Sequence, residues 1–190
     1  MDFSEKIVDY TDRLIAQIRK TDIKTVNRMM NLLLEARAND KQVFIMGNGG
    51  SGASASHIAN DYNKGLSYGK DKGKRWRWFC LSDNAPTVLS LANDVGYSEI
   101  FVEQLKNFLN TGDIVIGISG SGNSDNVLKA IQYANECGNT TIGLTAYRGG
   151  KLKNEAAISL HFDISDMQIA EDLHMMLLHA MMNVFYSTDC

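Results

Sequence analysis

The spacing of hydrophobic positions along the chain changes near residue 40. Over residues 3–38 the apolar residues recur at the helical period, and Thr21 with Asp22 offers an N-cap that divides this stretch into two helices. Short apolar runs of strand length follow, namely QVFIMG, RWFCLS, DIVIGIS, TTIGLTA and AISLHFDI. The segments between and after these runs favour helices, namely SASHIANDYNKG, NAPTVLSLAND, 98–109, 124–136 and 167–186.

Strands that alternate with helices predict a parallel sheet covered on both faces. The runs are apolar almost throughout, as strands buried on both sides of a sheet require. We therefore expect a three-layer α/β/α sandwich around a central parallel sheet. The 190 residues suffice for one such domain, with N-terminal helices (1–40) outside an α/β core (41–190).

Composition and charge narrow the class of protein. Lys and Arg number 19 against 22 Asp and Glu, and the net charge of −3 argues against nucleic-acid binding through bulk positive charge. The basic segment DKGKRWRW (71–78) is short, and we expect it to shape the substrate site or a subunit interface. No apolar run reaches the roughly 20 residues that span a bilayer, and we see no secretory signal. The scattered cysteines Cys80, Cys137 and Cys190 form no disulfide framework, so we expect a reducing cytoplasm.

Two glycine-rich loops are predicted at the carboxyl ends of strands, where open parallel sheets bind ligands. They are GNGGSG (47–52) and ISGSGNSDN (118–126), and the second opens a helix. Its hydroxyls on Ser119, Ser121 and Ser124, with the free amides of a helix N-terminus, suit a phosphate monoester. The same residues would also make an ordinary turn and N-cap. Neither loop has the GxxxxGK[ST] spacing of a nucleoside triphosphate site, and we expect no nucleotide cofactor.

A histidine and a carboxylate follow the first glycine loop on one helix face. His57 and Asp61 are four residues apart, which places them about 40° apart around a helix. This arrangement suits two metal ligands, and it equally suits an ordinary surface hydrogen bond. The glycine loop just upstream favours the metal because it brings the pair near the ligand crevice.

The C-terminal helix carries two further histidines. His174 and His179 are about 140° apart around the helix and cannot easily share one metal. We expect His174 to be structural or to contact another subunit. By the same helical geometry, Asp172 is better aligned with His179 than Glu171 is.

Four segments in their order and spacing resemble the sugar isomerase (SIS) domain family. They are GNGGSGASASHIAND (47–61), LAND (91–94), DIVIGISGSGNSDNVLKAI (113–131) and EDLHMMLLH (171–179). The first and last are typical of the phosphoheptose isomerase branch, and the resemblance covers nearly the whole chain. It implies a flavodoxin-like SIS domain that isomerises sedoheptulose 7-phosphate to D-glycero-D-manno-heptose 7-phosphate by proton transfer through an enediol.

The resemblance also implies roles for particular residues. Those that would line the sugar site are Asn48, Gly49, Gly50, Ser51, Asn93 and Asp94. Those that would hold the phosphate are Ser119, Gly120, Ser121 and Ser124. The ligands of one divalent metal per subunit, zinc in the family, would be His57, Asp61, Glu171 and His179. Asp61 and His179 would also act as acid and base, and members of the family are homotetramers with sites at subunit interfaces.

Two positions depart from the family pattern. Asp61 stands where the family has glutamate, and Glu171 stands where it has glutamine. These changes leave a different sugar phosphate open as the substrate. A second alternative is a non-catalytic SIS module that senses sugar phosphates or binds a protein, as a replication-initiator-binding relative does. His57, Asp61 and His179 together favour catalysis, because a pure binding protein has no need of all three.

Overall fold

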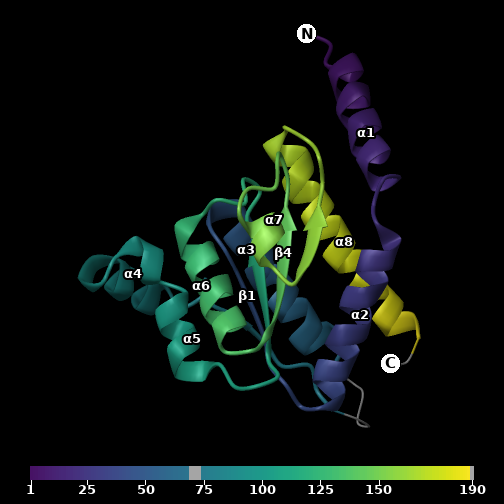
Figure 1. The fold of residues 1–190 in the computed structure, drawn as a ribbon. Coiled ribbons are helices and arrows are strands. Elements are labelled where there is room, and N and C mark those ends of the chain that lie inside the picture. Colours follow the sequence, from purple (N-terminus) through teal and green to yellow (C-terminus); the bar gives the residue numbers. More distant parts are fainter. Residues whose placement is uncertain (69–73, 189–190) are drawn as a thin grey trace.

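The structure, a computed structural model, describes residues 1–68 and 74–188 and is built around a five-stranded parallel sheet (Figure 1). The strands are β1 (Val43–Gly47), β2 (Trp78–Cys80), β3 (Ile114–Ile118), β4 (Thr140–Thr145) and β5 (Ile158–His161). Their order in the sheet is β2-β1-β3-β4-β5, and every neighbouring pair is parallel. This is the flavodoxin-like order, in which the chain changes direction of winding between β1 and β3.

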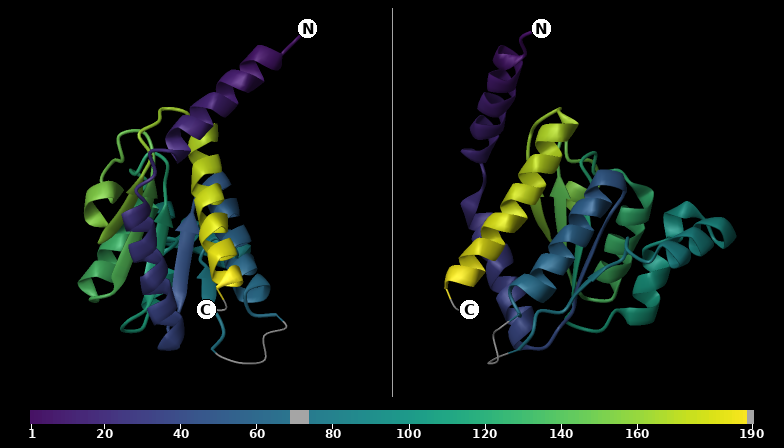
Figure 2. Two further views of the ribbon diagram at one scale, coloured as in Figure 1. Left: turned by 90° about the vertical axis from the view of Figure 1, so that its right-hand side faces the viewer. Right: turned by 180° about the vertical axis from the view of Figure 1, so that it is seen from behind.

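Helices cover both faces of the sheet, as the apolar strands require (Figure 2). On one face, Val43 and Ile45 pack against α2 (Ile23–Ala38), α3 (Gly49–Asn60) and α8 (Met167–Ser187). On the other, Phe44 and Met46 pack against α5 (Val102–Phe108), α6 (Asp125–Glu136) and α7 (Leu152–Glu155). The predicted three-layer α/β/α sandwich is confirmed.

Two helices stand away from this body (Figure 1). Helix α1 (Ser4–Ile18) is held near its middle and end, where the Tyr10 hydroxyl donates to Asp172 and Arg13 pairs with Asp166 at 2.8 Å. Its first turns extend beyond the sandwich. Helix α4 (Ala85–Asp94) projects from the opposite side, and among the described residues it has no buried side chain.

Helix α2 is part of the sandwich and not an addition outside it. Met29 and Leu33 of α2 are fully buried in the same apolar cluster as the strands. The reason lies in the sheet, because without α2 the β4–β5 half of one face would expose its isoleucines and leucines to water. The expected separation of helices 1–40 from the core therefore applies to α1 alone.

The first glycine loop also differs from expectation, because most of it is helical. Helix α3 begins at Gly49, directly after Asn48 with its extended backbone, and ends in a π-helical turn at Asp61–Gly65. The short helix α7 had no signal in the pattern. In the part of the chain that the structure describes, no helix combines the length and apolar character needed to cross a membrane.

The segment DKGKRWRW begins outside the described residues, at 71–73. Its described tryptophans, Trp76 and Trp78, are buried and make ring contacts with Tyr62 in the core, the first edge to face and the second tilted. They are therefore packing residues of this domain, not exposed rings on which nucleic-acid bases could stack.

Candidate functional site

Both predicted ligand loops meet where the winding of the sheet reverses. The segment that begins with Asn48 follows β1, and the serine loop Ser119–Ser124 follows β3. Since β1 and β3 are neighbours in the sheet, their carboxyl ends open into one crevice. A cavity of about 310 Å³ lies here, lined by residues of both segments, of α8 and of the turn after β4. The lining includes Asn48, Ser51, Ser119, Gly120, Ser121, Ser124, Tyr147, Met167, Glu171 and His174.

The serine loop presents hydroxyls and helix amides to this cavity. Ser119 and Ser124 have their Oγ atoms 3.1 Å apart, and Ser119 is buried. Ser124 occupies the N-cap of α6 but makes no side-chain capping hydrogen bond. Its hydroxyl and the amides of Asp125 and Asn126 at the start of this 12-residue helix are placed for an anion, whereas the Val127 amide donates to Asn126 Oδ1 at 2.9 Å. The structure brings Ser119, Gly120, Ser121 and Ser124 together as predicted.

The turn after β4 holds the serine loop in place. Gly122 has a φ of 64°, and its carbonyl oxygen accepts a hydrogen bond of 3.0 Å from the Leu152 amide. A Cβ at Gly122 would lie 1.9 Å from the carbonyl oxygen of Gly149. Only glycine allows the two loops to pack backbone against backbone, which fixes the hydroxyls of the serine loop.

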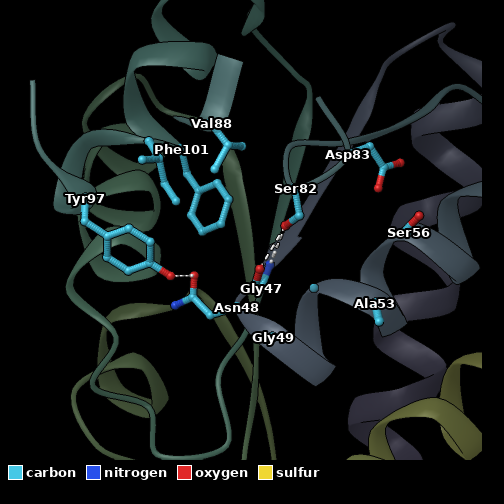
Figure 3. A pocket seen from close by; sticks show the side chains of 12 residues that line it. Gly47, Asn48, Gly49, Ala53, Ser56, Ser82, Asp83, Val88, Tyr97 and Phe101 are labelled. Carbon is cyan, nitrogen blue, oxygen red and sulfur yellow. Dashed lines mark hydrogen bonds between the residues drawn. The ribbon is translucent and has the colours of Figure 1, made fainter. Parts of the chain in front are cut away.

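Asn48 joins the start of α3 to the start of α6. Its amide pairs reciprocally with that of Asn126, through two hydrogen bonds of 2.9 Å, and its Oδ1 also accepts from the Tyr97 hydroxyl at 2.9 Å. Figure 3 shows this contact at the edge of a second cavity, of about 280 Å³, with Tyr97 and Phe101 facing Asp83 and Ser56 across it. Asn48 lines both cavities, and its side chain acts mainly as a fixed wall between them.

Three predicted metal ligands converge farther along α3 and α8. The Nε2 atoms of His57 and His179 are 2.9 Å apart, and Asp61 Oδ2 lies 3.2 Å from the first and 3.4 Å from the second. The side chains of His57 and His179 are half-exposed, with that of Asp61 more covered. Among the described residues this is the one cluster of His, Cys, Asp and Glu side chains that could hold a metal.

The cluster fits a divalent ion on its own geometry. Tetrahedral zinc with ligand bonds of about 2.0–2.1 Å holds its donor atoms about 3.3 Å from one another. The three donor–donor separations in the cluster, 2.9, 3.2 and 3.4 Å, lie within a few tenths of an ångström of that value. Two imidazole nitrogens and a carboxylate oxygen also form a donor set that zinc accepts in catalytic sites, which keep one position open.

Glu171 and Asp172 lie outside this cluster. The Glu171 carboxylate is beside Gly50, where a Cβ would lie 2.6 Å from its Oε1, and it faces the cavity of the serine loop. Asp172, which helical geometry favoured as a partner of His179, accepts the hydrogen bond from Tyr10 instead. Within the described chain the candidate metal cluster therefore has three members, and the predicted fourth ligand, Glu171, faces the cavity of the serine loop.

Asn93 and Asp94 are not brought to the site within one chain. Both are exposed at the end of α4, and the Asn93 amide donates to the Asp94 carboxylate at 2.7 Å. Neither residue lines the two cavities described above.

Several residues around the site were not predicted as site residues from the sequence. Tyr97 and Asn126 support Asn48 from positions far along the chain, and Tyr147 and His174 complete the wall of the serine-loop cavity. Burial lowers the pKa of His174 to about 4. Asn126 could have been suspected, because it stands in the first turn of the helix that the serine loop opens.

The proteins that this chain resembles in sequence and in structure agree with the fold and the site described above. The SIS domain matches residues 7–146. The chain is 34% identical over 161 residues to a phosphoheptose isomerase of Helicobacter pylori (strain P12), covering 81% of this chain and 79% of that protein. It is 33% identical over 162 residues to a phosphoheptose isomerase of Clostridium acetobutylicum, covering 85% and 81%. The solved structure of phosphoheptose isomerase GmhA from Neisseria gonorrhoeae superposes with a TM-score of 0.86 at 26% identity, over 98% of this chain and all of that one.

The chain has a flavodoxin-like sheet with a serine loop at its winding reversal and matches the SIS domain over residues 7–146, so it belongs to the SIS domain family. Within it, the relatives that match over most of both chains place this protein on the phosphoheptose isomerase branch. The predicted family and branch are confirmed.

Proposed function

We propose that the protein is an aldose–ketose isomerase that converts sedoheptulose 7-phosphate to D-glycero-D-manno-heptose 7-phosphate. One observation carries the proposal: helices α3 and α8, which bring His57 and His179 together, also line the cavity of the serine loop through Ser51 and Glu171. Both named relatives with more than 30% identity are phosphoheptose isomerases.

The spacing along those helices suits a long substrate. Ser51 and His57 are six positions apart along α3, and Glu171 and His179 are eight positions apart along α8. At 1.5 Å per residue, these separations are about 9 and 12 Å. An extended seven-carbon sugar phosphate is long enough to place its phosphate at the serine loop and its carbonyl end at the cluster. A shorter ketose phosphate would leave one end unheld.

The reaction moves one proton between neighbouring carbons. In the ketose, a base removes a proton from C1, and the electron pair of that bond forms the C1–C2 double bond while the C2 oxygen gains a proton. Loss of the proton from the C1 oxygen and return of a proton to C2 then give the aldehyde. The site must therefore supply a base near the carbons and an acid near the oxygens.

We assign Asp61 and His179 to these two tasks. Asp61 Oδ2 and His179 Nε2 are 3.4 Å apart, so both can reach neighbouring atoms at the C1–C2 end of the substrate from the same side, one holding a proton while the other receives one. Both are partly exposed in the single chain, which leaves them open to a substrate. We assign Glu171 and the backbone at Gly50 to the sugar hydroxyls, since that carboxylate faces the cavity and can accept hydrogen bonds from them.

His57, Asp61 and His179 would hold a divalent metal, for which zinc is the family precedent. When bound, such an ion would polarise the substrate's carbonyl and favour the enediol. Gly50 would help to keep Glu171 at the cavity, away from the cluster.

The single chain also presents surfaces that support the predicted homotetramer. The apolar stripe that seats Tyr10 and Leu14 against the body continues along α1 to Ile7, which is 65% exposed. Helix α4 carries Asn93 and Asp94 away from the chain's own site. A second copy of the chain would cover the stripe. Asp94 of a neighbouring copy would then accept hydrogen bonds from those sugar hydroxyls that the chain holding the sugar does not itself bind. A reducing cytoplasm suits such a protein, since Cys80 and Cys137 are unpaired.

Kinetics on a panel of sugar phosphates test the proposal. Metal-supplied protein is given sedoheptulose 7-phosphate, fructose 6-phosphate or ribulose 5-phosphate, and products are followed by NMR. We expect kcat/KM for the heptulose phosphate to exceed the others by at least tenfold. Preference for a shorter sugar would overturn the assignment in favour of another phosphosugar isomerase. Tight binding of the phosphates without turnover of any would favour a sensing module.

A further inference from the structure

His174 is a buried histidine that the proposed mechanism does not use. It is 1% exposed, yet it lines the same cavity as Ser119 and Ser124. Its Nε2 atom is buried and has no hydrogen-bond partner within the described chain. A buried polar atom without a partner is costly, so its presence at a ligand cavity calls for an explanation.

The hydrogen bonds of the ring define what Nε2 can do. His174 is hydrogen-bonded to the backbone of Thr145, and this contact favours the protonated ring, as donation to a carbonyl oxygen does. Since Nε2 has no partner, that donor is Nδ1. In the neutral ring Nδ1 then carries the hydrogen, and Nε2 carries a lone pair that can only accept.

An acceptor in this cavity selects among the groups of a sugar phosphate. The phosphate oxygens are themselves acceptors at neutral pH, and the hydroxyls of the serine loop and the amides of α6 are placed to donate to them. A bare imidazole nitrogen would repel such oxygens. The hydroxyl groups of the sugar chain next to the phosphate are donors, and they are the part of the substrate that would lie beside the serine loop.

We propose that His174 determines specificity, with its Nε2 accepting a hydrogen bond from the sugar hydroxyl on C5 or C6, the two carbons that precede the phosphate-bearing C7. The inference rests on the proposed function for the identity of the sugar. Through this bond His174 would distinguish a phosphate that carries a hydroxylated carbon chain from inorganic phosphate. A site built around such a bond rejects analogues that lack the hydroxyl, because the buried acceptor is then left unpaired.

Two substitutions separate this role from a structural one. In His174→Asn, the amide takes the place of Nδ1 and can still donate to Thr145, but nothing replaces Nε2. In His174→Gln, the amide reaches the position of Nε2 and can accept there, while the bond to Thr145 is lost. Circular dichroism and the thermal midpoint establish that each variant is folded.

The test measures binding of a non-reacting polyol, sedoheptitol 7-phosphate, and of its 5-deoxy and 6-deoxy analogues by calorimetry. We expect wild-type protein to bind the full polyol at least tenfold more tightly than one of the two analogues. We expect H174N to lose that preference, and H174Q to keep part of it. Inorganic phosphate should bind equally to all three proteins.

Unchanged discrimination in folded H174N would overturn the inference, as would an equal loss of affinity for every ligand including inorganic phosphate. Because the polyol cannot react, the result is independent of turnover. A His174-dependent preference in a protein that fails to isomerise sedoheptulose 7-phosphate would uphold this inference and reject the proposed function.

Discussion

The Nε2 atoms of His57 and His179 lie 2.9 Å apart, although the two residues are 122 positions apart in the chain. Helices α3 and α8 pack side by side on one face of the sheet and bring them together, and Asp61 completes the group from the turn that follows α3. At this separation two neutral imidazoles can share one hydrogen, whereas a bound cation would satisfy both nitrogens.

Removing one histidine should therefore abolish metal binding at the cluster. We expect His179→Ala to weaken zinc binding by more than about 100-fold, because losing a direct ligand costs more than the loss of about 10–100-fold that is typical when a residue supporting a ligand is changed. Calorimetric titration of metal-free protein measures the affinity. His161→Ala provides the control, because His161 contacts Thr145 and lies outside the cluster. Equal zinc affinity in H179A and wild type would show that the metal binds elsewhere.

Gly50 should act through Glu171. In Gly50→Ala the new methyl group would lie 2.6 Å from Glu171 Oε1, the end of a flexible side chain, so the carboxylate should move and the fold should persist. Alanine is also the better helix former, by about 0.5–1 kcal/mol. We expect the thermal midpoint to hold or rise while KM for the sugar phosphate rises about tenfold.

A double-mutant cycle isolates that effect. In a Glu171→Ala background, the Gly50→Ala change should have no further effect on KM, because the displaced group is gone. Additive effects of the two substitutions would mean that Gly50 acts on the substrate by another route.

His174 should make stability depend on pH in a defined range. Burial lowers the pKa of His174 to about 4 from an ordinary value of 6.5. Between these values the unfolded chain binds a proton that the folded chain does not. The contribution is therefore fully present above pH 6.5 and is lost as the pH falls toward 4, at about 1.4 kcal/mol per pH unit.

Urea unfolding of wild type and His174→Asn at several pH values, both with chelator, measures this contribution. We expect the free energy of unfolding to fall more steeply for the wild type, by about 3 kcal/mol in total over the range. Parallel pH profiles for the two proteins would contradict a neutral buried histidine.

The exposed stripe on α1 should govern assembly. Ile7→Lys places a charge on the apolar side of a helix that protrudes from the body, so it should change the free energy of unfolding of one chain by less than about 0.5 kcal/mol. We expect it to weaken association more than tenfold, measured by sedimentation. Asp12→Lys, on another side of α1, is the matched control. A tetramer that withstands Ile7→Lys would place the interface elsewhere.

Local patterns in the sequence predicted most of the fold. The strands are short apolar runs, and Asp22 caps α2 through hydrogen bonds to the amides of Lys24 and Thr25. The first glycine loop was harder, because glycine disfavours helix in isolation, whereas packing of α3 against β1 and α8 carries the helix back to Gly49. Local spacing cannot express that tertiary effect.

The site was predictable only where chemistry and resemblance agreed. The serine loop combines a strand end, a helix start and three hydroxyls within six residues, so a short stretch of sequence is enough to predict its role. Tyr97 and His174 depend on contacts across the fold, and no short pattern marks them. Helical geometry correctly predicted that His174 and His179 do not share a metal site. It could not predict that Asp172 accepts a hydrogen bond from Tyr10, which lies far away in the sequence.

The most direct test of the central claim is isomerisation of sedoheptulose 7-phosphate in D₂O, followed by NMR, with wild type and Asp61→Asn compared at equal metal content. The account predicts formation of heptose 7-phosphate with deuterium entering at C2, and a loss in kcat of about 10²–10⁴-fold in D61N. A folded, metal-supplied wild type that forms no heptose 7-phosphate, or a D61N variant with full activity, would contradict it.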